Sequence, residues 1–190
     1  MNKEELFNKL RRNTKQHFDM PEKMMEGIKY QDVVQQFIEM SHTVGCEVIE
    51  AKADDDINEL IQKAYPDAKV LASNLEWIKA DLNPDTVAKA QDLNGTDVGI
   101  IQGDIAVAEN GCVWVPQTMK ERVICFISEN LVILVQRDKI VNNMHEAYKK
   151  IHMTDYGYGC FISGPSKTAD IEQALVMGAQ AARGVTVIIM

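Results

Sequence analysis

One stretch decides the fold of this 190-residue chain: Gly159-Cys-Phe-Ile-Ser-Gly-Pro-Ser-Lys-Thr-Ala-Asp-Ile-Glu-Gln-Ala-Leu-Val-Met-Gly178. Its first part, Cys160 to Ile162, is a short apolar run that is typical of the end of a buried strand. The next four residues, Ser163 to Ser166, contain glycine and proline and break the strand. From Thr168 onward, small and apolar residues recur at three- and four-residue spacing, which predicts a helix. The stretch is therefore expected to fold as strand, tight loop and helix.

A helix that starts after such a loop offers a site for an anion. Its first backbone N–H groups lack partners and carry partial positive charge. Gly164 allows a ligand to approach the backbone closely, and Lys167 adds a positive charge. Ser166 and Thr168 offer hydroxyl groups. These features favour a phosphate or a carboxylate, while a plain capped helix start, with Asp170 in an acidic first turn, explains the same residues and stays open.

The charge of the chain limits the classes of partner. The net charge is -8 and the pI is about 5.0, which argues against a nucleic acid or an anionic membrane, because both bind clustered Lys and Arg. The first residues, Met1 to Phe7, are charged and lack an apolar run, and nowhere do about 18 apolar residues follow one another. We therefore expect a cytoplasmic protein without a signal peptide or a membrane span.

The sequence contains no pattern for a metal or a cofactor. Its four cysteines form no Cys-x-x-Cys pair, so neither a zinc site nor an iron–sulfur cluster is expected. We interpret them as reduced core residues; they are Cys46, Cys112, Cys125 and Cys160. No Gly-x-Gly-x-x-Gly is present, which argues against a nicotinamide site.

Strands and helices alternate along most of the chain. Apolar runs predict strands in residues 46–51, 69–73, 97–101, 113–115, 131–135, 160–163 and 185–190. Helical spacing appears in residues 3–18, 31–44, 57–64, 84–94 and 141–151. Continuous apolar runs, as in residues 132–135, are typical of buried parallel strands. We therefore expect an α/β fold, an open and mostly parallel sheet with helices on both faces, and the loop at residues 163–168 at a carboxyl end of the sheet, where ligands bind.

The chain is expected to comprise an N-terminal helical arm, residues 1–29, and a single α/β domain, residues 30–190. An apolar cluster of Met20, Met24 and Met25 lies in the polar connector between them. Clustered methionines usually fill a core or an interface. A second copy of the chain is therefore one partner that the arm is expected to contact.

A second group of candidate residues is the turn Glu109-Asn110-Gly111, which carries one carboxylate between two apolar segments. A glutamate on a turn is usually only solvated, but a carboxylate can also act as a nucleophile. Gly99 and Gly103 precede this turn at a spacing that suits close backbone approach. Glu109 is therefore the candidate catalytic residue, and Gly99, Asn110 and Gly111 are candidate ligand contacts.

The run Ser163-Gly-Pro-Ser-Lys-Thr-Ala-Asp-Ile-Glu172 resembles the signature of the LUD domain, the family of lactate utilization protein C. Residues 97–100 and 108–111 resemble the middle motif of the family, and residues 122–135 resemble its next block. The resemblance implies a fold like that of glucosamine-6-phosphate deaminase, ribose-5-phosphate isomerase and the CoA transferases. It also implies a non-redox component of L-lactate oxidation to pyruvate that works with iron–sulfur partner proteins.

The chain departs from the LUD pattern at several positions. Cys112 follows the glycine where the family tends to have Thr. Cys125, Ser128 and Leu131 stand in the block where the family has Ser, Pro and His. The usual His-Gly-Pro near the C-terminus is here Gln180-Ala-Ala182. Two histidines that would suit a carboxylate are thus absent, and we expect a divergent member of the family.

Three functions are consistent with these patterns. In the first, a small carboxylate or phosphate binds between the loops at residues 109–111 and 163–168, with Glu109 facing it and Arg122 assisting. The second is an enzyme of acyl-CoA or sugar-phosphate type, because Glu-Asn-Gly resembles the element of CoA transferases whose glutamate forms an acyl intermediate. The third is a scaffold whose N-terminal arm docks a partner or a second copy. The ligand contacts expected for the first are Ser163, Gly164, Pro165, Ser166, Lys167, Thr168, Asp170, Gly99, Asn110, Gly111 and Arg122.

Overall fold

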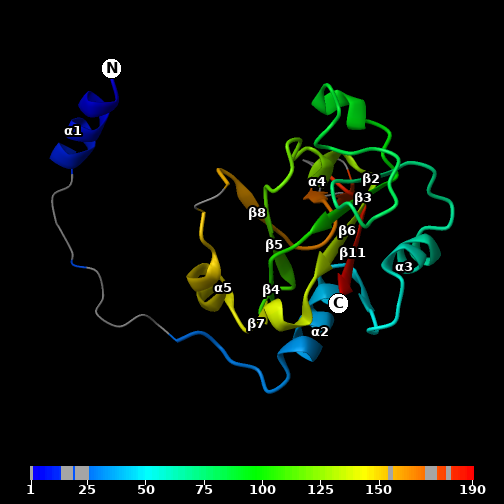
Figure 1. The fold of residues 1–190 in the computed structure, drawn as a ribbon. Coiled ribbons are helices and arrows are strands. Elements are labelled where there is room, and N and C mark those ends of the chain that lie inside the picture. The colour runs from blue at the N-terminus through cyan, green and yellow to red at the C-terminus, as the bar shows by residue number, and fades with distance from the viewer. Residues whose placement is uncertain (1, 14–18, 20–25, 154–155, 170–174, 179–180) are drawn as a thin grey trace.

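The computed structural model describes residues 2–13, 19, 26–153, 156–169, 175–178 and 181–190. Its centre is a five-stranded sheet with strand order β1-β11-β6-β3-β2 (Figure 1). These strands are β1 (Glu47–Glu50), β11 (Gly184–Ile189), β6 (Asn130–Val135), β3 (Val98–Gln102) and β2 (Leu71–Ser73). Every neighbouring pair in this sheet is parallel. The expectation of an α/β fold with a mostly parallel sheet is therefore confirmed.

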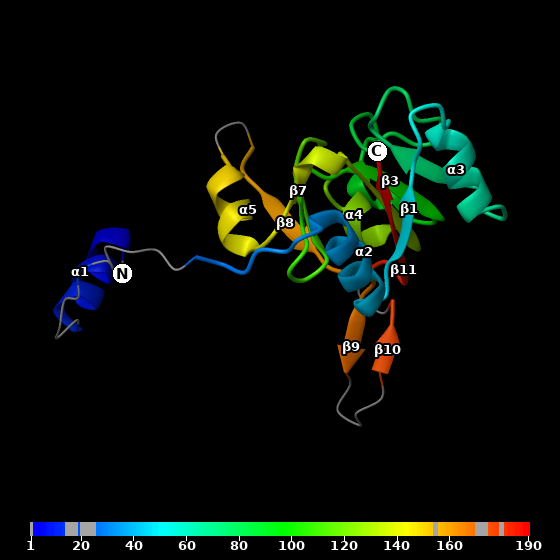
Figure 2. The same ribbon diagram turned by 90° about the horizontal axis from the view of Figure 1, so that it is seen from below.

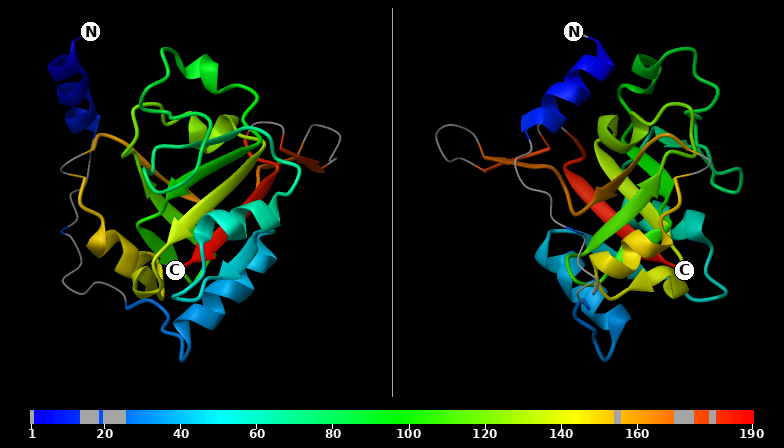
Figure 3. Two further views of the ribbon diagram at one scale, coloured as in Figure 1. Left: turned by 45° about the vertical axis from the view of Figure 1, so that its right-hand side comes forward. Right: turned by 90° about the vertical axis from the view of Figure 1, so that its left-hand side faces the viewer.

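Helices cover both faces of the sheet (Figure 3), as the sequence predicted. They are α2 (Val33–Thr43) and α4 (Ile124–Ile127) on one face and α3 (Ile57–Ala64) on the other. Successive residues of a strand point to opposite faces, so Leu131 and Ile133 of β6 share a buried cluster with Phe37 of α2. Val132 of the same strand shares the opposite cluster with Ile61 of α3. Burial on both faces explains the continuous apolar runs of the strands.

Polar side chains determine where α2 and α3 begin. The carboxylate of Asp32 accepts hydrogen bonds from the backbone N–H groups of Val34 and Gln35, at 3.1 and 3.0 Å. Asp56 caps α3 in the same way, through Asn58 N at 2.8 Å. These bonds satisfy N–H groups that have no partner inside the helix.

The chain also forms a second, four-stranded sheet with strand order β7-β4-β5-β8. Its strands are β4 (Ile105–Val107), β5 (Cys112–Pro116), β7 (Ile140–Val141) and β8 (Gly159–Ile162), and α5 (Met144–Lys150) packs on them. The sequence placed residues 113–115 and 160–163 in the parallel sheet, which is wrong, because β5 pairs antiparallel with both β4 and β8. The chain leaves the main sheet at Gly103, where a Cβ would collide with the Val113 side chain.

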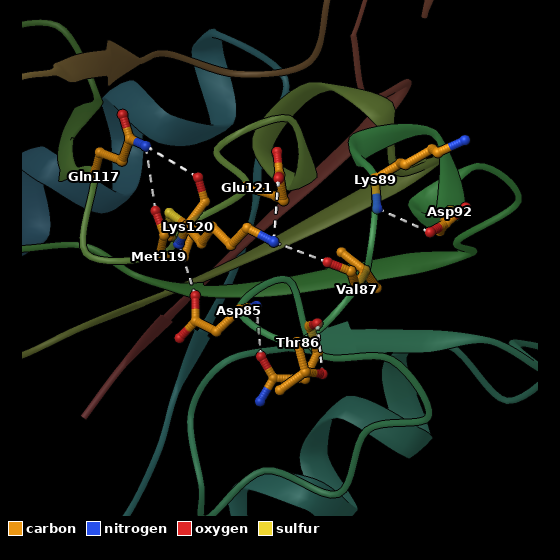
Figure 4. A network of polar contacts seen from close by, with 10 residues as sticks. Asp85, Thr86, Val87, Lys89, Asp92, Gln117, Met119, Lys120 and Glu121 are labelled. Carbon is orange, nitrogen blue, oxygen red and sulfur yellow. Dashed lines mark hydrogen bonds and ion pairs between the residues drawn. The ribbon is translucent and has the colours of Figure 1, made fainter.

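The segment at residues 84–94 forms a loop and not the predicted helix, apart from a short 3₁₀ turn, η1 (Ala90–Leu93). The segment after β5 holds this loop in place (Figure 4). Lys120 N donates to Asp85 Oδ1 at 2.7 Å, and Lys120 Nζ donates to Val87 O at 2.9 Å. These tertiary hydrogen bonds replace the helical ones that the local sequence favours.

The helix predicted from Thr168 onward is also absent from the described residues. The chain instead forms a hairpin of β9 (Lys167–Ala169) and β10 (Leu175–Met177), which pair antiparallel. Figure 2 shows this hairpin extending away from the two sheets. The helical spacing rested partly on Ala174 and Gly178. Small side chains bury little apolar surface, so their placement on one helix face adds little stability. Residues 175–177 are three successive apolar residues, which suits a strand, and residues 170–174 lie outside the described residues.

At the N-terminus, α1 (Lys3–Asn13) provides the expected helix over its described part. Its described residues are all exposed, and Figure 1 shows the helix apart from both sheets. Residues 14–18 and the methionines at 20, 24 and 25 lie outside the described residues. Within the described part of the chain, no helix combines the length and the apolar character that crossing a membrane requires.

Candidate functional site

The loop that follows β8, residues 163–167, lies at the amino ends of the central strands. Ser166 N donates to Ala182 O at 2.9 Å, just before β11 begins. Leu131 and Val185, near the starts of β6 and β11, line the same cavity as the loop. The expectation that this loop lies at a carboxyl end of the sheet is therefore wrong. The reason is topological, because β8 belongs to the smaller sheet and runs antiparallel to β5.

The same loop is packed against the C-terminal end of α2. Gly164 has φ +73°, and a Cβ at this position would collide with Val44 O, so only glycine fits. Lys167 Nζ donates a hydrogen bond to Val44 O, which places a cation at the negative end of the helix dipole. The ring of Pro165 lies 3.5 Å from where a Cβ of Gly45 would be. Gly164 and Lys167 therefore stabilise the fold, whatever they also do for a ligand.

A cavity of about 410 Å³ opens beside this loop, and every residue from Ser163 to Lys167 lines it. The rest of its lining comes from α4, β6, β8 and the chain at the start of β11. Five of the expected ligand contacts are thus brought together in one cavity, namely Ser163, Gly164, Pro165, Ser166 and Lys167. Their role as ligand contacts stays a prediction.

The charge of the cavity is positive within the described part of its lining. Lys167 contributes a cation, and no described Asp or Glu lines the cavity. Cys125 also lines it, and burial raises the pKa of its thiol to about 12, so the thiol is neutral at pH 7. In a chain of net charge -8, this local field favours an anion over a cation.

Glu109 lies outside this cavity. Its exposed carboxylate accepts a hydrogen bond from Met144 N at 3.0 Å, in the first turn of α5, where negative charge is favourable. The two motif loops are nevertheless neighbours, because Ser163 Oγ donates to Asn110 O at 3.0 Å. Gly111 has φ +64°, and a Cβ there would lie 2.9 Å from the carbonyl carbon of Met40. Both loops therefore pack against α2, while the Glu109 side chain contacts α5.

Two other expected contacts lie away from the cavity lining. Gly99 sits within β3, where a Cβ would collide with the Ser128 hydroxyl, so this glycine lets α4 approach the sheet. The Arg122 guanidinium stacks on the Tyr158 ring at 4.4 Å and donates to Gln117 Oε1 at 3.3 Å. Neither residue is brought to the loop at 163–167.

The remaining expected contacts are only partly described. The backbone of Thr168 lies in β9, its side chain is not described, and Asp170 lies outside the described residues. Among the described residues, no group of three or more His, Cys, Asp or Glu side chains is placed to hold a metal ion.

Comparison with known families adds a decisive observation. A sequence model of the LUD domain matches residues 72–190, well over half of the chain and both motif loops. The chain belongs to the LUD-domain family. The suspected membership is therefore confirmed.

Curated relatives of this LUD-domain chain carry the name lactate utilization protein C. That of Oceanobacillus iheyensis is 33% identical over 102 residues, which are 50% of this chain and 43% of the relative. That of Exiguobacterium sp. is 25% identical over 181 residues, 83% of this chain and 77% of the relative. The match thus spans less than half the length of the first relative.

A solved structure supports the fold of the LUD-domain chain. A DUF162 family protein from Deinococcus radiodurans aligns with a TM-score of 0.66, covering 83% of this chain and 95% of that chain. The sequence identity is 16%, so the likeness concerns the fold alone.

Residues that are far apart in the sequence meet in the cavity. Cys125 and Leu131 line it from α4 and β6, and Ala181 and Ala182 line it before β11. The sequence analysis did not assign these residues to the site, because residues so far apart in sequence meet only in the fold. Phe126 and other apolar lining residues gave no signal in the sequence at all.

Proposed function

We propose that this LUD-domain protein binds a small organic anion in the cavity beside residues 163–167 and serves lactate utilization without a redox centre of its own. The observation that carries the proposal is the cavity's charge, with Lys167 in the lining and no carboxylate among its described residues. The relatives named lactate utilization protein C support the pathway. The protein works in the cytoplasm in this proposal, and iron–sulfur proteins of lactate oxidation are its partners.

The donors of the loop suit a carboxylate or a phosphate. A lysine ammonium group has three N–H donors, and Val44 O accepts one from Lys167, so two remain for a ligand. Ser163 Oγ already donates to Asn110 O, whereas the Ser166 hydroxyl has no hydrogen-bond partner among the described residues. Lys167 and Ser166 are therefore the principal anion contacts in this proposal.

The test is a titration calorimetry series with L-lactate, pyruvate and inorganic phosphate. Replacement of Lys167 by Gln is expected to weaken binding by at least about tenfold, because a charge-assisted hydrogen bond is lost. Lys63→Gln, an exposed lysine of α3, is the matched control and leaves affinity unchanged. Equal affinities for the Lys167→Gln variant and the parent protein would reject this site.

Catalysis by Glu109 stays a prediction. The carboxylate is bound to the start of α5 and not to the cavity lining, so an acyl transfer there requires substrate to reach the surface beside α5. Incubation with an acyl-CoA followed by intact-mass spectrometry tests it. A covalent adduct that disappears in Glu109→Gln would support an enzyme, and an unmodified mass would exclude this acyl-enzyme.

A role as a scaffold is favoured by one observation on α1. Leu6 and Phe7 are 41% and 45% exposed, which is unusual for adjacent large apolar side chains on a helix. We expect the arm, residues 1–29, to contact a partner or a second copy. Sedimentation of the full chain and of a chain lacking residues 1–29 tests this expectation. If both chains are monomers at high concentration, the arm does not mediate self-association.

A further inference from the structure

The cavity beside residues 163–167 divides into an exposed polar rim and a buried apolar floor. Ser163 and Lys167 are exposed and stand at the rim. The floor is formed by four residues that are each at most 5% exposed: Cys125 of α4, Leu131 of β6, Val185 of β11 and Ala182 just before β11. A ligand that fills the cavity therefore meets charge at one end and hydrocarbon at the other.

The volume of the cavity exceeds what a three-carbon acid occupies. About 410 Å³ corresponds to roughly 14 water molecules at about 30 Å³ each. The floor offers no carboxylate or cation among its described residues, and the thiol of Cys125 is a weak hydrogen-bonding group. Water in the floor is poorly bound, so an apolar group that displaces it gains affinity.

We propose that the ligand is a carboxylic acid with an apolar chain, bound with its carboxylate at Lys167 and its chain against the floor of Leu131 and Val185. This inference rests on the proposed anion site and adds the class of ligand. The carboxylate supplies the orientation, because Lys167 lies at the rim. The chain supplies most of the affinity, because each buried methylene is removed from water.

The side chains of the four floor residues carry no oxygen or nitrogen atom. The floor therefore presents one thiol and otherwise hydrocarbon side chains to a ligand. A ligand more apolar than lactate suits such a wall, because unpaired polar groups in the floor would otherwise oppose its chain.

The experiment is a calorimetric titration of the full chain with the straight-chain acids from acetate to octanoate, with L-lactate and with hexanol. Affinity is expected to rise about fourfold for each methylene until the floor is filled. The heat-capacity change of binding is expected to become more negative in parallel, which is the mark of apolar burial. Hexanol, which lacks the carboxylate, is expected to bind at least about tenfold more weakly than hexanoate.

Two variants test where the apolar chain of the bound acid lies in the cavity. Ala182→Val and Ala181→Leu add methyl groups to the cavity wall, and each is expected to weaken octanoate at least about tenfold while leaving acetate unchanged. Ala181 is only half-buried, so its variant folds even where Ala182→Val does not. Ala90→Leu, in η1, is the control outside the cavity and leaves all affinities unchanged.

The outcomes separate this inference from the proposed function. Equal affinity for all chain lengths, lost in Lys167→Gln, would overturn the inference and leave the anion site intact. Binding of hexanol as tight as that of hexanoate would overturn both, because the carboxylate would then play no part. Failure of every acid to bind would overturn the inference, and failure of inorganic phosphate to bind as well would reject the anion site.

Discussion

The two motif loops, residues 109–111 and 163–167, each contain a glycine but differ in the charged group that they present. Each contains a glycine with positive φ that packs against α2, Gly111 on Met40 and Gly164 on Val44. The first loop gives its carboxylate to the start of α5. The second lines a cavity and contributes its cation.

The difference shows that glycine in a motif does not by itself mark a ligand site. Both glycines are required because α2 lies too close for a side chain, which is a packing requirement. What distinguishes the second loop is the apolar cavity behind it and the absence of carboxylates from its described lining. The comparison therefore predicts that disrupting either loop lowers the free energy of unfolding by a similar amount. Only disruption of the second loop is expected to weaken ligand binding.

The largest expected effect is that of replacing these glycines. Gly164→Ala and Gly111→Ala are each expected to lower the free energy of unfolding by about 3 kcal/mol, because an unfavourable φ is combined with a backbone collision. Urea unfolding at constant pH measures the change. Gly95→Ala is the matched control: it has φ +84° and nothing within 4 Å of the added Cβ, so about 1 kcal/mol is expected. Equal losses at all three positions would show that φ alone matters and that neither loop is tightly packed on α2.

The main sheet was predictable because its pattern is repeated over several strands. Runs such as residues 131–135 are buried on both faces by helices, and a continuous apolar run indicates such a strand without further information. The smaller sheet was not predictable in its pairing, since β4 follows β3 after two residues and only the bend at Gly103 separates them. The hairpin of β9 and β10 was missed because apolar spacing in residues 168–178 fits a helix as well as it fits strands.

A smaller effect is expected for the stability of the Lys167→Gln variant. Lys167 Nζ caps the carbonyl of Val44 at the end of α2, so the loss of its charge removes a favourable dipole interaction of about 1 kcal/mol. The unfolding midpoint in urea measures it. Lys167→Arg keeps the charge and is expected to restore most of the stability, whereas an anion site that needs a compact ammonium is expected to stay weakened. If the Lys167→Gln variant is as stable as the parent protein, Lys167 does not stabilise α2.

Substitution of Glu109 is expected to cost less and to leave the cavity untouched. Glu109→Gln keeps an oxygen that can accept the hydrogen bond of Met144 N and removes the charge at the start of α5, about 0.5 kcal/mol. Glu109→Ala removes the hydrogen bond as well, and about 1 kcal/mol is expected. Thermal unfolding measures both, and acid binding by calorimetry is expected to stay unchanged. A loss of acid affinity in Glu109→Gln would mean that the two loops form one site, as the sequence suggested.

The candidate site was predicted where a motif is continuous and missed where it is assembled by the fold. Residues 163–167 are adjacent in sequence and line one cavity. Gly99 and Arg122 share sequence blocks with the family, yet the first supports α4 and the second stacks on Tyr158. Phe126 and Val185 come from separate elements and are ordinary core-like residues in sequence, so only the fold places them in the wall.

The smallest expected effect is a pH dependence of the stability of α5, the helix that Glu109 contacts. Glu146, in the first turn of α5, has a lowered pKa, chiefly because the Asn142 side chain donates hydrogen bonds to its carboxylate. A carboxyl group whose pKa is lower in the folded state binds fewer protons there than when unfolded, so it stabilises the fold above its unfolded pKa of about 4.3. This stability is lost as the pH falls through the lower, folded pKa.

Thermal unfolding of the parent protein and of Glu146→Gln between pH 7 and pH 3 measures this contribution. The difference in melting temperature is expected to favour the parent at pH 7 and to shrink as the pH falls below about 4, because the carboxyl group is then protonated in both states. Acid binding by Glu146→Gln at pH 7 is expected to equal that of the parent, because this residue does not line the cavity. A difference in melting temperature that does not change with pH would assign the contribution of Glu146 to packing, and the charge contrast between the two loops would then rest on Glu109 and Lys167.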